Sequence, residues 1–537
     1  MYLLLNISIV KTYYSLLETY LKVPKDEDRR LTRINKSKLN AMVALGTSII
    51  MGIASFVERM VFNRFFIADY LGLYNLFNNI MGMLSITNLG LGTSIAYSLY
   101  EPLANDDEAQ ISATIKLYHS VYKVVGTIIL VGGLIVLPCL KFMVNTSIDI
   151  GHVRLYFVFY IIRTCMGYFL SPLEILVNAN QDHYKTTLVT NTCWTLLYIA
   201  QIVISLLTQD FLLYSAAITF FAIARTLTIN HIARKDFPYL KKYGGTKVRP
   251  ERVKRLIKNT KGLLYSKFGD FLFSAADSTL ISMLVNTATL GRYANYIMIS
   301  KGMRTVCNLL PTSITASIGD AGVTESKHDL SGMFKTLNVS CFLIYSTITV
   351  LLINISTPFV TTFFGPDRGL PFVSVVLIFA DFYLACQRTI ISTFKSSLGL
   401  YWEDRWRPIL AGVINLISSI ILGNLIGLNG ILLGTVISYL SVNSIFEPLT
   451  VIHLGLHTSA VWYFISTLGH LLLTSGVTAL TLLINSFLPL TGIAEVLVKA
   501  VVTLTVTLAI YYLIYHKTEE YAVIVNVLKQ ALRKKKK

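Results

Sequence analysis

The sequence predicts an all-α polytopic membrane protein of about 14 transmembrane helices, with two six-helix lobes followed by two further helices. The first observation is composition: mean hydropathy is +0.60 and only 14% of the residues are charged, against about 25% in soluble proteins. Apolar runs of roughly 20 residues, the length that crosses a bilayer as a helix, recur from about residue 40 to residue 515. The third observation is an internal repeat.

The repeat relates residues 71–98 to a stretch 219 residues later in the chain. The alignment runs without gaps over about 45 residues, a longer register than chance identities in apolar helices produce. We therefore expect two homologous lobes in a parallel repeat, related by a pseudo-twofold axis along the membrane normal. The identical pairs are Leu71 with Leu290, Gly72 with Gly291, Tyr74 with Tyr293, Leu91 with Leu310, Thr93 with Thr312, Ser94 with Ser313, Ile95 with Ile314, Ser98 with Ser317, Ser112 with Ser331 and Lys116 with Lys335.

The amino-terminal half is expected to contain a leading segment, one lobe and a linker. Residues 1–37 carry an apolar helical stripe and basic residues, which predicts an amphipathic segment in the cytoplasm or at the membrane interface. Residues 38–231 form the first lobe, and residues 232–261 form a basic cytoplasmic linker. The six spans of the first lobe are expected over residues 41–63, 73–100, 118–140, 152–177, 186–207 and 211–231.

The carboxyl-terminal half follows the same plan with an addition. Residues 262–452 form the second lobe, residues 453–515 add two spans outside the repeat, and residues 516–537 form a basic amphipathic cytoplasmic tail. The spans are expected over residues 262–285, 293–318, 337–358, 371–396, 408–426, 430–452, 461–486 and 494–515.

The net charge of +18 is concentrated in two clusters. Eleven Lys and Arg residues fall within residues 234–261, and four lysines form residues 534–537. Because basic residues beside membrane spans stay in the cytoplasm, we expect both termini and the linker there, in a multi-pass protein of the cytoplasmic membrane. Such clusters contact membrane lipids with anionic headgroups, so nucleic acid is not expected as a partner.

The loops between the spans argue against an enzyme. The expected outward loops have only about three to a dozen residues, too short for the extracytoplasmic domain of a polysaccharide polymerase or glycosyltransferase. The sequence has no cysteine–histidine metal spacing, no phosphate-binding glycine loop and no nucleophile elbow. We therefore expect a transporter with no catalytic residues, no metal and no cofactor.

Charged residues inside the predicted spans are the candidate functional residues, because a charge in the bilayer costs a few kcal/mol and usually faces protein or water. Arginine's forked guanidinium group suits phosphate oxygens. The cations expected to line a cavity for a diphosphate are Arg59, Arg163, Lys301, Arg304 and Arg388. The acids that could take up a coupling H⁺ or Na⁺ ion are Glu58, Asp277 and Asp381. For both sets the open alternative is structural ion pairing between helices.

A second group of polar residues is expected near the ends of spans. Asp182 and Asp404 occupy matching loops, where we expect helix capping or pairing between loops. Trp402 and Trp406 are expected to anchor the chain at the membrane interface. The cations expected to reach the interface by snorkelling are Arg64, Arg225, Lys267 and Lys395.

Five sequence blocks in a fixed order carry a family resemblance over residues 40–455. The blocks are Glu58–Ala104, Asp277–Ile299, Ser313–Ser326, Gly399–Leu410 and Gly427–Ser438, the last followed by Glu447-Pro448. With them the chain resembles the oligosaccharide repeat-unit flippases (Wzx type) of the multidrug/oligosaccharidyl-lipid/polysaccharide exporter superfamily. It looks most like those of Gram-positive capsule and exopolysaccharide loci. Asp381 departs from the family pattern, in which a polar uncharged residue is expected.

The resemblance implies a flippase that works by alternating access. Such a protein takes an undecaprenyl-diphosphate-linked oligosaccharide from the cytoplasmic side and releases it outside, driven by H⁺ or Na⁺ gradients or by consumption of the substrate. A polysaccharide polymerase and assembly proteins would be its partners. The sequence agrees in having no Walker motif. The alternatives are a lipid II flippase, a MATE-like drug/ion antiporter and, less favoured, a polysaccharide polymerase.

Overall fold

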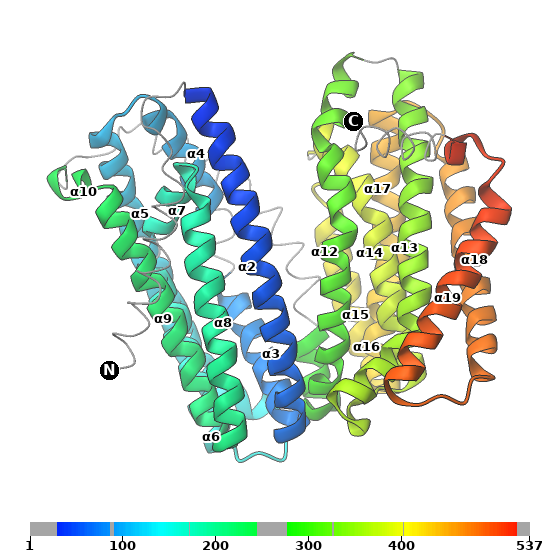
Figure 1. Cartoon of the computed structure of the whole chain (residues 1–537), viewed down its shortest axis with the longest axis horizontal. Helices are drawn as coiled ribbons and strands as arrows, with labels where there is room; N and C mark the ends of the chain where they lie inside the picture. Colours follow the sequence, from blue (N-terminus) through cyan, green and yellow to red (C-terminus); the bar gives the residue numbers. More distant parts are fainter. Residues whose placement is uncertain are drawn as a thin grey trace. The chain divides into compact units, whose positions relative to one another are not determined.

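The computed structural model describes residues 29–85, 91–170, 172–243, 277–324, 327–400 and 402–522, and the regular elements in these ranges are all helices (Figure 1). Eleven of the described helices are long and apolar enough to cross a membrane. The predicted all-α polytopic class is therefore confirmed, while the total of 14 spans stays a prediction. Most of the amphipathic leading segment, the seventh span and the tail lie outside the described residues.

The chain divides into two compact units. The first comprises residues 1–67, 77–142 and 148–267, and the second comprises residues 68–76, 143–147 and 268–537. Helix α3 begins in the second unit and ends in the first. The described helices up to residue 243 are α2 (Arg29–Phe65), α3 (Ala68–Leu84), α4 (Leu91–Ala104), α5 (Glu108–Met143), α6 (Ile150–Leu170), α7 (Pro172–Ala179), α8 (His183–Leu207), α9 (Phe211–Asp236) and α10 (Tyr239–Lys242).

The second half of the chain combines long α-helices with short π-helical stretches. One of its membrane spans, Leu428–Gly455, is built from α16, η4, α17 and η5 in succession. The elements are η2 (Ile281–Val285), α12 (Thr287–Thr324), α13 (Lys327–Phe364), η3 (Pro366–Arg368), α14 (Phe372–Ser397), α15 (Arg407–Ile426), α16 (Leu428–Ser438), η4 (Tyr439–Asn443), α17 (Ser444–Thr450), η5 (Val451–Gly455), α18 (Val461–Ser486) and α19 (Gly492–Tyr515).

The predicted repeat is visible in the helix boundaries. Helix α3 begins at Ala68 and α12 at Thr287, while α5 begins at Glu108 and α13 at Lys327, so both pairs of starts are 219 residues apart. An acidic residue stands in the first turn of both α5 and α13 and stabilises that end of the helix dipole. In the first copy α3 ends at Leu84 and α4 begins at Leu91, whereas in the second copy α12 runs from Thr287 to Thr324.

The two copies of the repeat meet at the first turns of α3 and α12, within the second unit. A Cβ atom added to Gly72 would overlap the backbone carbonyl of Thr287, and one added to Gly291 would overlap that of Ala68. Gly72 and Gly291 are equivalent in the repeat, as are Ala68 and Thr287, so one contact is made twice with exchanged roles. Glycine is required at both positions because any side chain would separate the two backbones.

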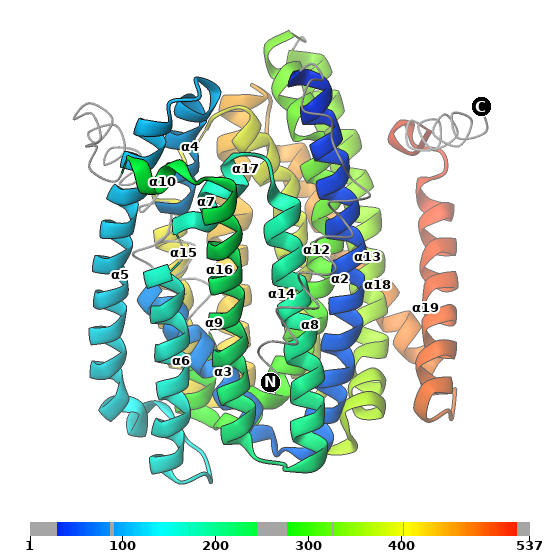
Figure 2. The same ribbon diagram turned by 60° about the vertical axis from the view of Figure 1, so that its left-hand side comes forward.

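The two helices outside the repeat, α18 and α19, pack against α13. Figure 2 draws both of them on the side of α13 that faces away from α12. His470 of α18 stacks on Phe342 of α13 with ring centroids 3.8 Å apart. The Asn485 side-chain amide donates to Asn354 Oδ1 at 2.7 Å and to Thr503 Oγ1 at 2.9 Å. Such hydrogen bonds join neighbouring helices in a bilayer, where lipid chains offer no polar partner.

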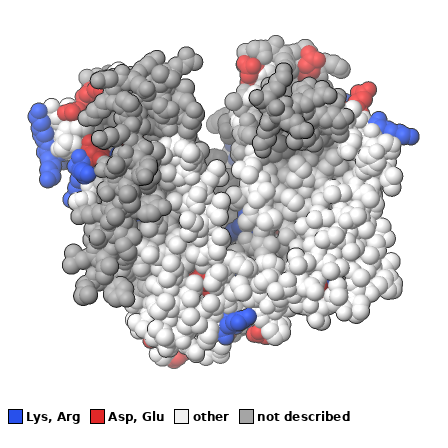
Figure 3. All heavy atoms as spheres, viewed as in Figure 1, with Lys and Arg blue, Asp and Glu red and all other residues white. Residues whose placement is uncertain are grey.

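The described surface on the face seen in Figure 3 is mostly uncharged. In the space-filling view the sides are largely white, and most blue and red side chains lie near the ends of the helices (Figure 3). Large apolar side chains such as Ile53 on α2 and Leu472 on α18 are more than 60% exposed. Exposed apolar surface of this kind is stable against lipid chains, which agrees with a multi-pass membrane protein.

Candidate functional site

Two of the predicted coupling acids, Asp277 and Asp381, come together in the second unit, where they interact electrostatically. Asp277 precedes η2, and its Oδ2 accepts a hydrogen bond from the Thr435 hydroxyl of α16 at 3.0 Å. The same hydroxyl lies 3.1 Å from Asn415 Oδ1 of α15. Oδ1 of Asp277 and Oδ1 of Asp381 are buried without a hydrogen-bond partner among the described residues.

This arrangement gathers several oxygen atoms around two carboxylates in a membrane span. A buried polar atom without a partner is costly, and a proton, a cation or a water molecule would satisfy such a carboxylate oxygen. Oxygen donors suit hard cations. Among the described residues, no group of three or more His, Cys, Asp and Glu side chains could hold a metal ion, so the site would rely on Thr435 and Asn415 for further oxygens.

The three predicted cations of the second unit lie on two helices that pack together, α12 and α14. Lys301 and Arg304 stand one turn apart on α12 and interact electrostatically, and Arg304 also acts on Asp381 of α14. Arg304 and Arg388 both act on Tyr439, which is hydrogen-bonded to Arg388. The second unit therefore brings Lys301, Arg304 and Arg388 into one neighbourhood.

Arg388 belongs to a buried network of ion pairs. Its Nε donates to Glu447 Oε2, and the other oxygen of Glu447 accepts a hydrogen bond from Lys395. Lys395 Nζ is also 2.6 Å from Asp404 Oδ2, and Arg407 Nε is 2.8 Å from Asp404 Oδ1. The network thus joins α14, the start of α15 and α17. Three cations surround the fully buried Glu447 side chain. Their charges compensate that of the acid inside the membrane span.

The predicted site residues of the first unit have different partners. Arg163 Nη2 of α6 donates to Asn78 Oδ1 of α3 at 2.7 Å, and its guanidinium lies over the Tyr160 ring. Arg59 is half-buried on α2 and acts electrostatically on the neighbouring Glu58. The structure therefore does not bring Arg59 and Arg163 into one network.

Glu58, the third predicted coupling acid, is buried on α2. The Tyr214 hydroxyl of α9 donates to Glu58 Oε1 at 2.5 Å. The rings of Phe62, Phe66 and Tyr214 lie against one another beside it. Glu58 is therefore a single buried acid in an aromatic environment, unlike the paired acids of the second unit.

Two sequence expectations were wrong, because Lys395 and Arg225 do not snorkel to the interface. Lys395 is 7% exposed and lies inside the Glu447 network. Arg225 Nη2 of α9 is 2.5 Å from Glu174 Oε1 of α7, and its Nε donates to Thr190. Both cations have an acid within reach on a neighbouring helix, and the ion pair compensates their charge inside the protein.

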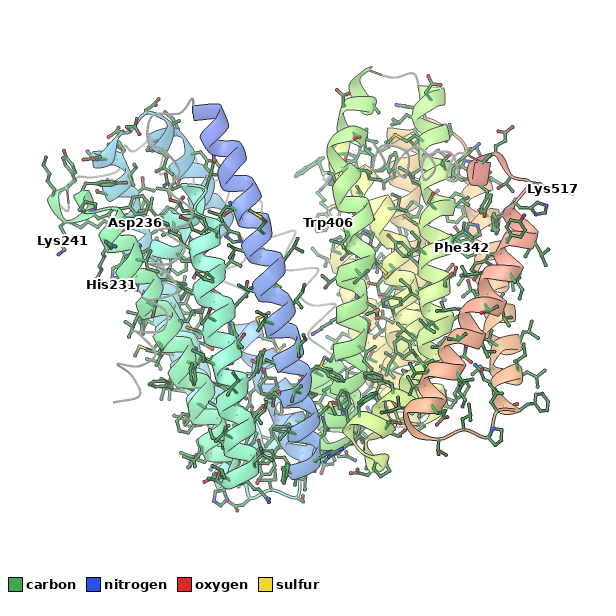
Figure 4. All side chains as sticks on the ribbon, in the orientation of Figure 1. His231, Asp236, Lys241, Phe342, Trp406 and Lys517 are labelled. Carbon is green, nitrogen blue, oxygen red and sulfur yellow. The ribbon has the colours of Figure 1, made fainter. Side chains whose placement is uncertain are left out.

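Other end-of-span residues can also be placed. Asp236 lies at the end of α9 (Figure 4), and Lys185 at the start of α8 is 2.6 Å from it. Trp402 and Trp406 are 70% and 67% exposed, and the Arg405 guanidinium lies 4.0 Å from the Trp402 ring centroid. Asp182 accepts a hydrogen bond from the Asn180 amide, and Arg64 is exposed at the end of α2. Lys267 lies outside the described residues.

Glu447 is the functional candidate that sequence reasoning missed. In the sequence it was noted only as part of the Glu447-Pro448 pair inside an apolar run. A buried acid in a span needs cationic partners, and the three that it has are 40 to 59 residues away in the sequence. The signal was thus the acid itself, but its partners could not be assigned.

No protein-family model and no curated protein matches this sequence. Among solved structures, the chain is similar to the lipid II flippase MurJ in an inward closed conformation, with a TM-score of 0.64, 12% identity and coverage of 88% of this chain and 99% of that one. It is similar to an inward-facing multidrug resistance MATE family transporter of the MOP superfamily, with a TM-score of 0.59, 12% identity and coverage of 76% and 97%. The chain therefore shares the fold of these membrane proteins.

Proposed function

We propose that the protein is a flippase that moves an undecaprenyl-diphosphate-linked oligosaccharide repeat unit across the cytoplasmic membrane for capsule or exopolysaccharide synthesis. The observation that carries the proposal is the group of cations Lys301, Arg304 and Arg388 on packed helices of the second unit. The sequence resemblance to repeat-unit flippases and the fold shared with the lipid II flippase MurJ support it.

In this proposal the cations bind the diphosphate group. Charge-assisted hydrogen bonds to phosphate are about twice as strong as neutral ones, and arginine offers two parallel donors. Arg304 and Arg388 would hold the phosphate oxygens, with Lys301 as a third charge. Arg59 and Arg163 of the first unit are proposed as separate substrate contacts. The protein would be a transporter rather than an enzyme, and both of its termini would be cytoplasmic.

Asp277 and Asp381 are proposed to couple transport to H⁺ or Na⁺. Their orphaned Oδ1 atoms would bind the ion, and Thr435 and Asn415 would complete the oxygen ligands for Na⁺. Glu58, held by Tyr214, is a separate candidate for proton uptake in the first unit. Asp277→Asn is expected to abolish the Na⁺ or pH dependence of transport, whereas unchanged dependence would reject this role.

Lipid II is the second candidate substrate, because the MurJ structure covers 88% of this chain. A lipid II flippase would present the same diphosphate chemistry to the same cations. A MATE-like drug antiporter fits less well, because cations inside the spans repel cationic drugs. Partners such as a polysaccharide polymerase remain proposals that follow from the repeat-unit substrate.

Export of surface polysaccharide tests the proposal. In cells that lack the protein, the wild-type chain should restore surface polysaccharide, and Arg388→Ala and Arg163→Ala should not. Arg64→Ala, at an exposed cation at the end of α2, is the matched control and should restore export. Immunoblots of membranes must show equal amounts of each variant. Normal surface polysaccharide in both arginine variants would refute the proposed diphosphate site.

A further inference from the structure

The network around Glu447 has a geometry that bears on how Arg388 is held. The two oxygens of the Glu447 carboxylate have separate partners: Oε2 accepts from Arg388 Nε, whereas Oε1 accepts from Lys395 and is 3.5 Å from Arg407 Nη2. The acid therefore contacts the guanidinium group of Arg388 at Nε, and the same group is hydrogen-bonded to Tyr439. The Glu447 side chain is 0% exposed and the Arg388 side chain 24% exposed, so the arginine is the outermost cation of the network.

The backbone of the span supports this position of Glu447. Glu447 and Asn443 are four residues apart and lie on one face of the helix. Asn443 Oδ1 accepts a hydrogen bond from Arg407 Nη1, so both residues reach the same network. The short helix α17 that carries Glu447 is flanked by the π-helical stretches η4 and η5, and Pro448 cannot donate a backbone hydrogen bond. Irregular turns of this kind re-aim side chains and occur frequently at functional sites.

The first unit provides an internal comparison. Arg225 follows Asp182 by 43 residues, and Glu447 follows Asp404 by the same 43. Arg225 pairs with Glu174, which lies just before Asp182, and Glu447 pairs with Lys395, which lies just before Asp404. The two halves therefore hold equivalent helices together with ion pairs of opposite polarity. In the second half, Glu447 also binds Arg388, which is proposed to contact the substrate.

We propose that Glu447 is the positioning residue of Arg388. It binds Arg388 at Nε and thereby sets the orientation in which the guanidinium group meets the diphosphate of the substrate. Lys395, Asp404 and Arg407 fix the Glu447 carboxylate in turn, so the orientation of Arg388 depends on the start of α15. This inference rests on the proposed function, because it gives Arg388 a diphosphate to bind.

Binding of farnesyl diphosphate to the purified full-length protein tests the inference by titration calorimetry. Arg388→Ala is expected to weaken binding about tenfold or more, the effect of losing one charged hydrogen bond. Glu447→Gln is expected to weaken binding by a similar factor. The double variant should bind no more weakly than Arg388→Ala alone, because Glu447 acts through Arg388. Glu174→Gln, which breaks the corresponding pair of the first unit, should leave binding unchanged.

Glu447→Asp distinguishes a loss of binding from a loss of folding. It retains the charge for Lys395 and Arg407 but draws the carboxylate back by one methylene. It should keep the unfolding temperature close to that of the wild type while weakening binding several-fold. Wild-type affinity in a folded Glu447→Asp or Glu447→Gln protein, or additive losses in the double variant, would overturn the positioning role.

The same binding experiment distinguishes failure of the positioning role from failure of the proposed function. If Glu447 is not a positioning residue, the wild type still binds farnesyl diphosphate and Arg388→Ala still weakens that binding. If the diphosphate site itself is wrong, neither the wild type nor any variant binds the probe, and Arg388→Ala restores surface polysaccharide in cells.

Discussion

Replacing Gly72 by alanine tests the contact between the two copies of the repeat. The added Cβ would overlap the Thr287 carbonyl oxygen, and it would come within 2.7 Å of Thr287 Cγ2 and 2.9 Å of the carbonyl carbon. Two of these three atoms are backbone, so a side-chain rotation does not relieve the overlap and the first turns of α3 and α12 must separate. Overpacking of this kind costs about 1–3 kcal/mol. Alanine favours a helix over glycine by about 1 kcal/mol, so the net loss is about 0–2 kcal/mol.

Gly82→Ala is the control for the gain in helix propensity. Gly82 lies on the same helix as Gly72, and no atom is within 4 Å of a Cβ added at Gly82. In thermal unfolding of the purified protein, Gly72→Ala should be less stable than Gly82→Ala by about 1–3 kcal/mol. Gly291→Ala should be less stable than its own control, Gly302→Ala, by a similar amount. The double variant Gly72→Ala/Gly291→Ala should lose less than the sum, because one separation of the helices relieves both overlaps. Equal stability of Gly72→Ala and Gly82→Ala would refute the close contact.

Two further predictions concern buried polar contacts and are measured by the same unfolding assay. Asn485→Ala removes the hydrogen bonds that join α18 to α13 and α19 and should lower stability by about 0.6–1.7 kcal/mol; an equal effect of Asn424→Ala, at an exposed amide bonded to its own helix, would contradict it. Tyr214→Phe deprives the buried Glu58 carboxyl of a donor and should cost about 1–3 kcal/mol. Tyr512→Phe, at an exposed ring, should be neutral, and a loss as large as that of Tyr214→Phe would count against the Glu58 contact.

The helical class and the repeat could be predicted from the sequence because both leave local signals. Apolar runs report membrane spans directly, since the bilayer accepts few charges. Identities such as Gly72 with Gly291 fix a register of 219 residues, and helices α12 and α13 begin where that register places them. The glycine identities also mark a contact, because both residues are needed for close approach of the backbones.

The partners of the buried charges could not be predicted, because they are far apart in the sequence. Arg225 and Glu174 are separated by 51 residues, and Lys395 and Glu447 by 52. Seen alone, a cation near the end of an apolar run indicates snorkelling, and only the packing of α14 against α17 reveals the acid within reach. The near-equal separations follow from the repeat, so aligning the two halves around Asp182 and Asp404 was a signal that could have linked the pairs.

Flipping of a fluorescent undecaprenyl-diphosphate-linked oligosaccharide by the purified protein in liposomes tests the central claim most directly. A membrane-impermeant quencher reaches only the outer leaflet, so label in the inner leaflet is protected until it is flipped. We predict that the wild-type protein exposes the protected label and that Arg388→Ala does so much more slowly at equal protein content. Label that stays protected with the wild type, as in protein-free liposomes, would contradict the account.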